Sequence, residues 1–132
     1  MPAITFKTDE DVEVIINPAS IIDANNLKNT ILKLFKQNNF DITNISSVKS
    51  MIEAIMILDS SEEFQKSIFA CLSRSVYKMQ RIDLELFNDE TARQYYYEIL
   101  IKCLEVNISP FFKKALIRLL GSPQIESSNT QS

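Results

Sequence analysis

The chain has 132 residues, of which 45% are hydrophobic and 23% are charged, a balance typical of one folded globular domain. Its single glycine argues against phosphate-binding and dinucleotide-binding loops, which need glycine where the backbone approaches the ligand. A net charge of −3 argues against a general nucleic-acid-binding surface, and the lack of histidine removes the commonest general base and metal ligand.

The first 17 residues predict a β-hairpin. Residues 4–7 and 12–16 are short β-like runs, and alternate residues of the second run are apolar, as in a half-buried strand. Residues 8–11 would form the connecting turn. Their acidic cluster lacks the spacing and the glycine of a calcium-binding loop, so we interpret it as a solvated turn.

Two helices are expected next. Asn17 and Pro18 have the features of an N-cap and a first helical residue, which predicts a helix from there to about Asn38. Its expected inward face comprises Ile21, Ala24, Leu27, Ile31, Leu34 and Phe35. Ser46 or Ser47 then begins a shorter helix. The expected inward residues of that helix are Val48, Met51, Ile52 and Ile55.

Ser60 and Glu63 fit a capping box for a third helix. The apolar positions expected on it are Phe64, Ile68, Cys71, Leu72, Val76 and Met79. Residues 81–87 alternate apolar and charged side chains, which is consistent with either a strand or a connector pinned by its apolar residues. We favour the connector.

A fourth helix begins at Asn88 or Asp89 and has apolar residues on two faces, which is typical of a central helix. The first face comprises Ala92, Tyr96, Ile99, Cys103 and Val106, and the second comprises Tyr97, Ile101, Leu104 and Ile108. Successive helical residues point about 100° apart. We therefore expect Tyr95, Tyr96 and Tyr97 to pack against different neighbours and not to form one aromatic patch.

A fifth helix is marked at both ends, by Ser109 and Pro110 at its start and by Gly121 after its end. Its expected inner face comprises Phe112, Ala115, Leu116 and Leu119. We therefore predict a mainly α fold, with about five helices in a compact single domain over residues 1–120. A short N-terminal β-hairpin occupies residues 1–17, and residues 121–132 are expected to be a disordered C-terminal tail.

We find no pattern typical of catalysis or of cofactor binding, and we expect neither. The acidic pairs Glu62-Glu63 and Asp89-Glu90 lie at helix starts, where negative charge stabilises the helix dipole. Cys71 and Cys103 lie in apolar runs without partners at zinc spacing. We expect two buried free thiols, while a disulfide or a reactive nucleophile stays open as an alternative.

Three short tracts carry a resemblance to a known family. They are CLSRSVYK from Cys71, LFNDETARQYYYEI from Leu86 and VNISPFFKKAL from Val106. These tracts resemble the tail assembly chaperones of long, non-contractile-tailed bacteriophages. The opening hairpin and the following INPASIIDANNLK are similar to the family's start as well, so the resemblance covers roughly residues 12–120.

The resemblance implies a non-enzymatic chaperone that binds the tape measure protein, keeps it soluble and helps to recruit tail tube protein subunits. It also implies a homo-oligomer in the cytoplasm of the infected host bacterium that is absent from the mature virion. We expect no nucleic-acid partner, because the chain has a net charge of −3. We also expect no membrane partner, because no apolar stretch approaches the ~20 residues of a membrane span. The alternative is a small acidic helical module for regulation or protein interaction, similar to an antitoxin.

The candidate partner-binding surface comprises the last predicted helix and the outer face of the first, because end helices are the most apt to leave apolar area uncovered. The candidate residues Phe111, Lys114 and Arg118 lie in the last predicted helix. Phe111 lies on a different side of that helix from Phe112, so it is available to a partner. The alternative is that Phe111 packs back onto Ile108 or the preceding helix. The basic residues have an alternative role as well, because cations offset the negative end of a helix.

Overall fold

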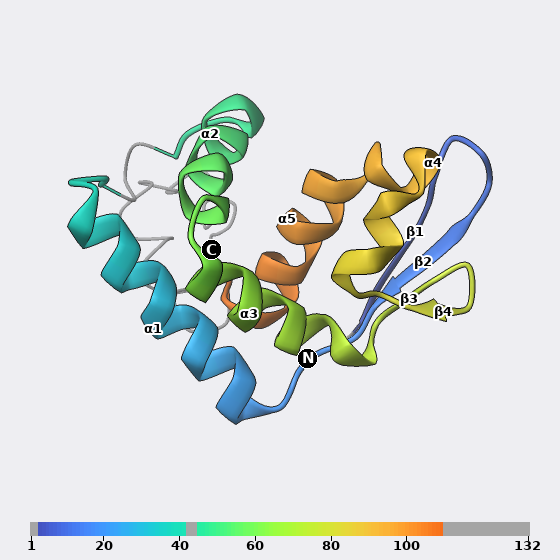
Figure 1. Cartoon of the computed structure of the whole chain (residues 1–132), viewed down its shortest axis with the longest axis horizontal. Coiled ribbons are helices and arrows are strands. Elements are labelled where there is room, and N and C mark those ends of the chain that lie inside the picture. Colours follow the sequence, from blue (N-terminus) through green and yellow to red (C-terminus); the bar gives the residue numbers. More distant parts are fainter. Residues whose placement is uncertain (1–2, 42–44, 110–132) are drawn as a thin grey trace, which may run out of the picture.

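The computed structural model describes residues 3–41 and 45–109 of the chain. Within these residues, a small antiparallel sheet lies at one end of the molecule and three helices lie at the other (Figure 1). The central helix α5 (Tyr96–Asn107) lies between them and contacts strand β2 as well as helices α2 and α3. The mainly α fold with a short N-terminal hairpin is therefore confirmed.

The sheet has four strands in the order β1-β2-β3-β4, and each neighbouring pair is antiparallel. The strands are β1 (Ile4–Lys7), β2 (Glu13–Ile16), β3 (Val76–Tyr77) and β4 (Gln80–Arg81). The predicted N-terminal hairpin is formed by β1 and β2. The second hairpin, β3–β4, was not predicted, and it joins the sheet through pairing of β2 with β3.

Five α-helices are present in the described residues. Besides α5, they are α1 (Ile21–Gln37), α2 (Val48–Asp59), α3 (Glu62–Cys71) and the short α4 (Glu90–Arg93). Two 3₁₀ helices, η2 (Leu72–Arg74) and η3 (Leu84–Asn88), complete the connections. One apolar core joins the sheet to the helices. Its largest fully buried side chains include Val14, Ile16, Leu27, Ile55, Phe64, Ile68 and Ile99.

Helix α1 begins later than predicted. Its N-cap is Ser20, whose side chain accepts a hydrogen bond from the backbone N of Asp23 at 3.1 Å. Asn17 instead tethers the preceding loop, because its amide Nδ2 donates to the carbonyl oxygen of Arg74 at 2.7 Å. The prediction that Ile21 faces the core is also wrong: this first helical residue is 69% exposed. The other five residues of the predicted inward face are buried.

The start and the end of α3 also differ from prediction. Ser61, not Ser60, caps α3 by accepting from the backbone N of Phe64, while the hydroxyl of Ser60 donates to Ile57 at the end of α2. The helix ends at Cys71, so the helical positions assigned to Val76 and Met79 are wrong. The chain there leaves the helix because residues 76–77 pair with the edge of β2.

The predicted fourth helix is divided into α4 and α5. Asp89 caps α4 as predicted, with Oδ2 accepting from the backbone N of Ala92 at 2.9 Å. Tyr95 lies between the two helices in a non-helical conformation. The favoured connector over residues 81–87 holds except at Arg81, which belongs to β4. Ile82 and Phe87 are buried and pin it as expected, but Leu84, expected to do the same, is 51% exposed. The predicted fifth helix and C-terminal tail lie outside the described residues.

Candidate protein-binding surface

The three candidate site residues from the sequence, Phe111, Lys114 and Arg118, lie outside the described residues. Their assignment as partner contacts therefore stays a prediction. The described part of the chain contains other candidate contacts. Family-like residues whose side chains already stabilise the fold are separated below from apolar side chains that remain exposed.

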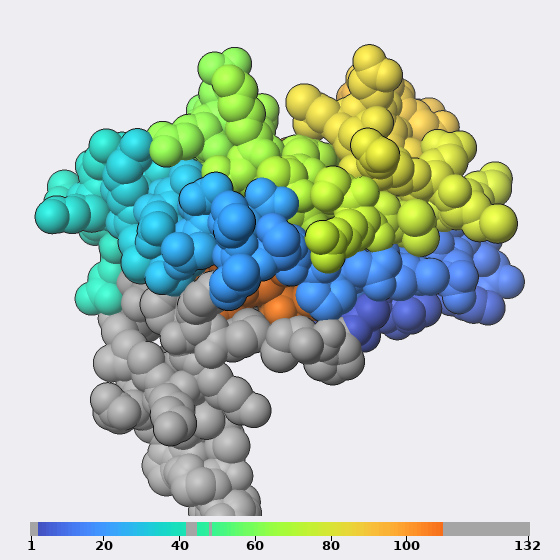
Figure 2. All heavy atoms as spheres, turned by 90° about the horizontal axis from the view of Figure 1, so that it is seen from below, coloured from blue at the N-terminus to red at the C-terminus, as the bar shows by residue number. Residues whose placement is uncertain are grey.

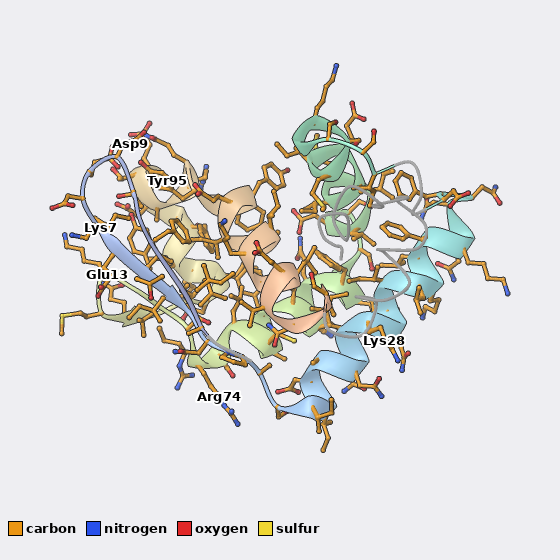
Figure 3. The ribbon with its side chains drawn as sticks, turned by 180° about the vertical axis from the view of Figure 1, so that it is seen from behind. Lys7, Asp9, Glu13, Lys28, Arg74 and Tyr95 are labelled. Carbon is orange, nitrogen blue, oxygen red and sulfur yellow. The ribbon has the colours of Figure 1, made fainter. Side chains whose placement is uncertain are left out.

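The tracts that carry the resemblance mainly secure turns and helix ends. Arg93 donates from Nε to the carbonyl oxygen of Phe87 at 2.8 Å, which ties α4 to η3. Tyr95 lies against the β1–β2 turn beside Asp9 (Figure 3), and its hydroxyl accepts from the backbone N of Asp9 at 3.1 Å. The same hydroxyl donates to Oε1 of Glu10 at 2.7 Å. This hydrogen bond to Glu10, together with burial, raises the pKa of Tyr95.

A second group of contacts holds the linker between β2 and α1. Asn107 is buried, and its Oδ1 accepts from the backbone N of Ala19 at 2.8 Å. Its Nδ2 donates to the carbonyl oxygen of Cys103 at 3.0 Å. On the other side, the hydroxyl of buried Ser75 accepts from the backbone N of Asn17 at 3.0 Å. The polar side chains of these family-like residues are therefore used in hydrogen bonds that stabilise the fold.

The two cysteines are free and buried, as expected. Burial and, to a smaller extent, the nearby charge of Asp23 raise the pKa of Cys71 to about 12. Burial also raises the pKa of Cys103, with a smaller contribution from Cys71. Both groups are therefore neutral thiols near pH 7, whereas a nucleophilic cysteine needs a lowered pKa. This environment does not favour thiol catalysis.

Among residues 3–41 and 45–109, no group of three or more Cys, Asp or Glu side chains could hold a metal ion. The same residues contain no helix with the length and apolar character needed to span a bilayer. Neither observation points to a chemical site, so the surface itself is the remaining source of functional information.

An aromatic cluster connects α3, η3 and α5. It consists of Phe69, Phe87, Tyr96 and Tyr97, whose successive ring centroids lie 4.9–6.5 Å apart. The hydroxyl of Tyr96 donates to Oδ1 of Asp59 at 2.8 Å. The expectation that the tyrosines do not meet is wrong for Tyr96 and Tyr97, whose rings lie 5.3 Å apart. The separation of their Cβ directions does not prevent contact between the far ends of long side chains.

Three members of the aromatic cluster are only half-buried, namely Phe69, Tyr96 and Tyr97. Figure 2 shows the molecular surface hollowed between the ridge formed around the α2–α3 junction and the ridge formed by η3 and α4. The cluster comes from the elements that surround this hollow. It therefore combines a packing role with some aromatic area left at the surface.

Several large apolar side chains are exposed. On α1 they are Ile21 (69%), Ile22 (70%) and Leu32 (44%), and elsewhere they are Met56 (54%), Met79 (94%) and Leu84 (51%). Ile21 and Leu32 are 11 residues apart, which is close to three helical turns, so they lie on the same side of α1. An uncovered outer face on this helix was expected from the sequence, but Ile21 was assigned to the opposite, inward face.

Comparison with known proteins identifies a family. A family model described as phage tail assembly chaperone protein, TAC, matches residues 10–121 of the chain. No curated protein and no solved structure gives a significant match.

Proposed function

The chain belongs to the family of phage tail assembly chaperone proteins, and we propose that it binds the tape measure protein of its phage during tail assembly. It keeps that protein soluble and helps to recruit tail tube subunits around it. The family match over residues 10–121 carries this proposal. Family membership also favours a non-enzymatic role, and it favours the chaperone over the alternative of a small regulatory module.

The exposed apolar surface of α1 supports binding of a helical partner. Ile21 and Leu32 are separated by about 16 Å along the helix axis, at a rise of about 1.5 Å per residue. An apolar stripe on a partner helix presents side chains every three to four residues, so it can contact both positions at once. Covering such a stripe keeps a long helical protein from aggregating through its exposed apolar surface.

The proposal includes the last predicted helix as a second contact. Phe111 would supply an apolar contact, and Lys114 and Arg118 would supply positive charge beside it. Several copies of the chain on one long partner gain affinity through multivalency, although each contact is weak. We therefore also propose a homo-oligomer that acts in the cytoplasm of the infected host bacterium and is absent from the mature virion.

Co-expression with the tape measure protein of the same phage tests the proposal. We expect the chain to raise the soluble fraction of that protein and to co-purify with it. An unchanged soluble fraction and no co-purification would contradict the proposal. The same assay with tail tube protein added to the purified complex tests recruitment.

A surface variant separates binding from folding. Ile21→Ser combined with Leu32→Ser removes two exposed apolar side chains, so we expect reduced co-purification with little change in melting temperature. The matched control combines Asn29→Ser with Lys36→Ser, two exposed polar positions on the same helix. Equal loss of binding in both variants would show that this surface of α1 has no specific role.

A further inference from the structure

The β3–β4 hairpin has a turn whose residues disfavour its backbone conformation. Tyr77 pairs with Gln80, so the turn consists of Lys78 and Met79 alone. Their φ angles are 51° and 67°, both in the left-handed region. Two-residue hairpin turns of this kind strongly prefer Asn-Gly or Asp-Gly, because side chains with a Cβ crowd the backbone when φ is positive. The turn is therefore strained at both positions.

The surrounding structure holds this turn in place. The backbone N of Lys78 donates to the carbonyl oxygen of Glu13 at 3.0 Å, and that of Ile82 donates to Ser75 at 3.0 Å. Tyr77 and Ile82 are buried on either side of the turn. A strained conformation persists where its neighbours determine it in this way, and such sites are often functional.

The side chain at the tip contributes little to the fold. Met79 is 94% exposed, the highest value among the exposed large apolar side chains of the described residues. Figure 1 shows the β3–β4 turn projecting at the sheet end of the molecule, away from the core. The fold thus gains almost no packing from Met79 while its backbone is strained. Methionine is flexible and polarizable, which suits it to contacts with irregular apolar surfaces of a partner.

The tip is positively charged on an acidic chain. Lys78, Gln80 and Arg81 are all exposed around Met79. Neither Lys78 nor Arg81 forms an ion pair with another residue in the described ranges. The chain as a whole has a net charge of −3, so the tip differs in sign from the rest of the molecule. A site that complements it is apolar at its centre and acidic at its border.

We infer that residues 78–81, the β3–β4 tip, form a docking element that inserts Met79 into an apolar, acid-bordered site on the tape measure protein. This inference rests on the proposed function, which supplies the partner. The tip is too small to form a stable interface by itself, since specific interfaces bury about 800 Å² on each partner. It therefore acts together with other contacts, and its charge attracts the partner and selects the site.

A stabilised variant gives a sharp test. Lys78→Asn combined with Met79→Gly installs the turn sequence that this backbone prefers, so we expect the melting temperature to rise. The same change removes the apolar tip and one positive charge. We therefore expect the affinity for the purified tape measure protein, measured by calorimetry, to fall about tenfold or more. Loss of binding by a more stable protein is not explained by unfolding.

The control is Lys49→Ala, which removes an exposed positive charge from the first turn of α2. We expect it to bind like the unaltered chain. If the Lys78→Asn/Met79→Gly variant binds as well as the unaltered chain, the docking inference is overturned while the proposed function stands. If the unaltered chain does not bind the tape measure protein, the proposed function itself fails. If the variant loses self-association alone, the tip contacts a second copy of the chain, which also overturns the inference.

Discussion

The hydroxyl of Tyr95 lies 2.7 Å from Oε1 of Glu10, across 85 positions of the sequence. Tyr95 lies between α4 and α5, and Glu10 lies in the turn of the first hairpin. This contact therefore joins the end of the sheet to the start of the central helix. The backbone N of Asp9 donates to the same hydroxyl, so one side chain holds the turn at two points.

Replacing Tyr95 by Phe tests this tether. The change keeps the buried ring but removes the acceptor for Asp9 and the donor to Glu10. We expect the melting temperature to fall by a few degrees, because a backbone N–H loses its partner. Tyr97→Phe is the matched control, since the hydroxyl of Tyr97 has no hydrogen bond to the described residues. Equal melting temperatures for the two variants would contradict a tethering role.

Asn107→Ala removes the amide that fixes the linker before α1. The partly buried backbone N of Ala19 then loses its acceptor, and the buried side-chain contacts of Asn107 disappear. We expect the free energy of unfolding to fall by about 2 kcal/mol, from urea denaturation. Asn29→Ala on the exposed side of α1 is the control, for which we expect a change within about 0.5 kcal/mol.

Adjacent serines at the α2–α3 junction have different roles. Ser61→Ala removes the N-cap of α3 and should lower the free energy of unfolding by about 1 kcal/mol. Ser60→Ala removes an exposed hydrogen bond to Ile57 at the end of α2, so we expect a smaller loss. Urea denaturation of both variants distinguishes the two. A larger loss for Ser60→Ala would contradict the cap assignment in the structure.

Local signals explain which parts of the fold could be predicted. The first hairpin follows from alternation in residues 12–16, and Asp89 caps α4 by a signal that lies within one turn of helix. The α3 start was misplaced because Ser60 and Ser61 are both good caps, and local preference alone does not separate them. Only packing against other helices selects Ser61.

Long-range contacts explain what could not be predicted. Val76 and Met79 continue the helical spacing of α3, but pairing with β2, about 60 positions earlier in the chain, draws this segment into the sheet. Exposure of Ile21 likewise depends on where α1 packs, which its own periodicity does not specify. The candidate surface was therefore only partly accessible from sequence. Phe111, Lys114 and Arg118 remain predictions, and the tip at Met79 was assigned to a helix.

The buried thiols predict a loss of stability at alkaline pH. In the folded chain the pKa of Cys71 is about 12, against 9.0 for the free group, because burial disfavours the thiolate. A pKa raised by folding contributes stability that is present below pH 9.0 and is lost as the pH rises from there toward 12. The free energy of unfolding, followed by urea denaturation, should therefore stay level near pH 8 and decrease above pH 9.

Cys71→Ala separates this effect from other alkaline titrations. The variant lacks one buried thiol, so its stability should fall less steeply with pH above 9.0, whatever its stability at neutral pH. Cys103 and the tyrosines with raised pKa values, Tyr77, Tyr95 and Tyr96, account for the slope that remains. An identical slope in both proteins would show that Cys71 does not resist ionisation in the folded state.

Phe111→Ser tests the partner contact predicted from the sequence. If Phe111 faces a partner, the variant keeps its melting temperature and loses co-purification with the tape measure protein. If Phe111 packs onto Ile108 or the preceding helix, the melting temperature falls because a large buried apolar side chain is lost. Phe112→Ser is the matched control, since Phe112 lies on the predicted inner face and its replacement should destabilise the fold. A contact role for Phe111 therefore requires the two neighbouring phenylalanines to behave in opposite ways, as their positions about 100° apart on a helix predict.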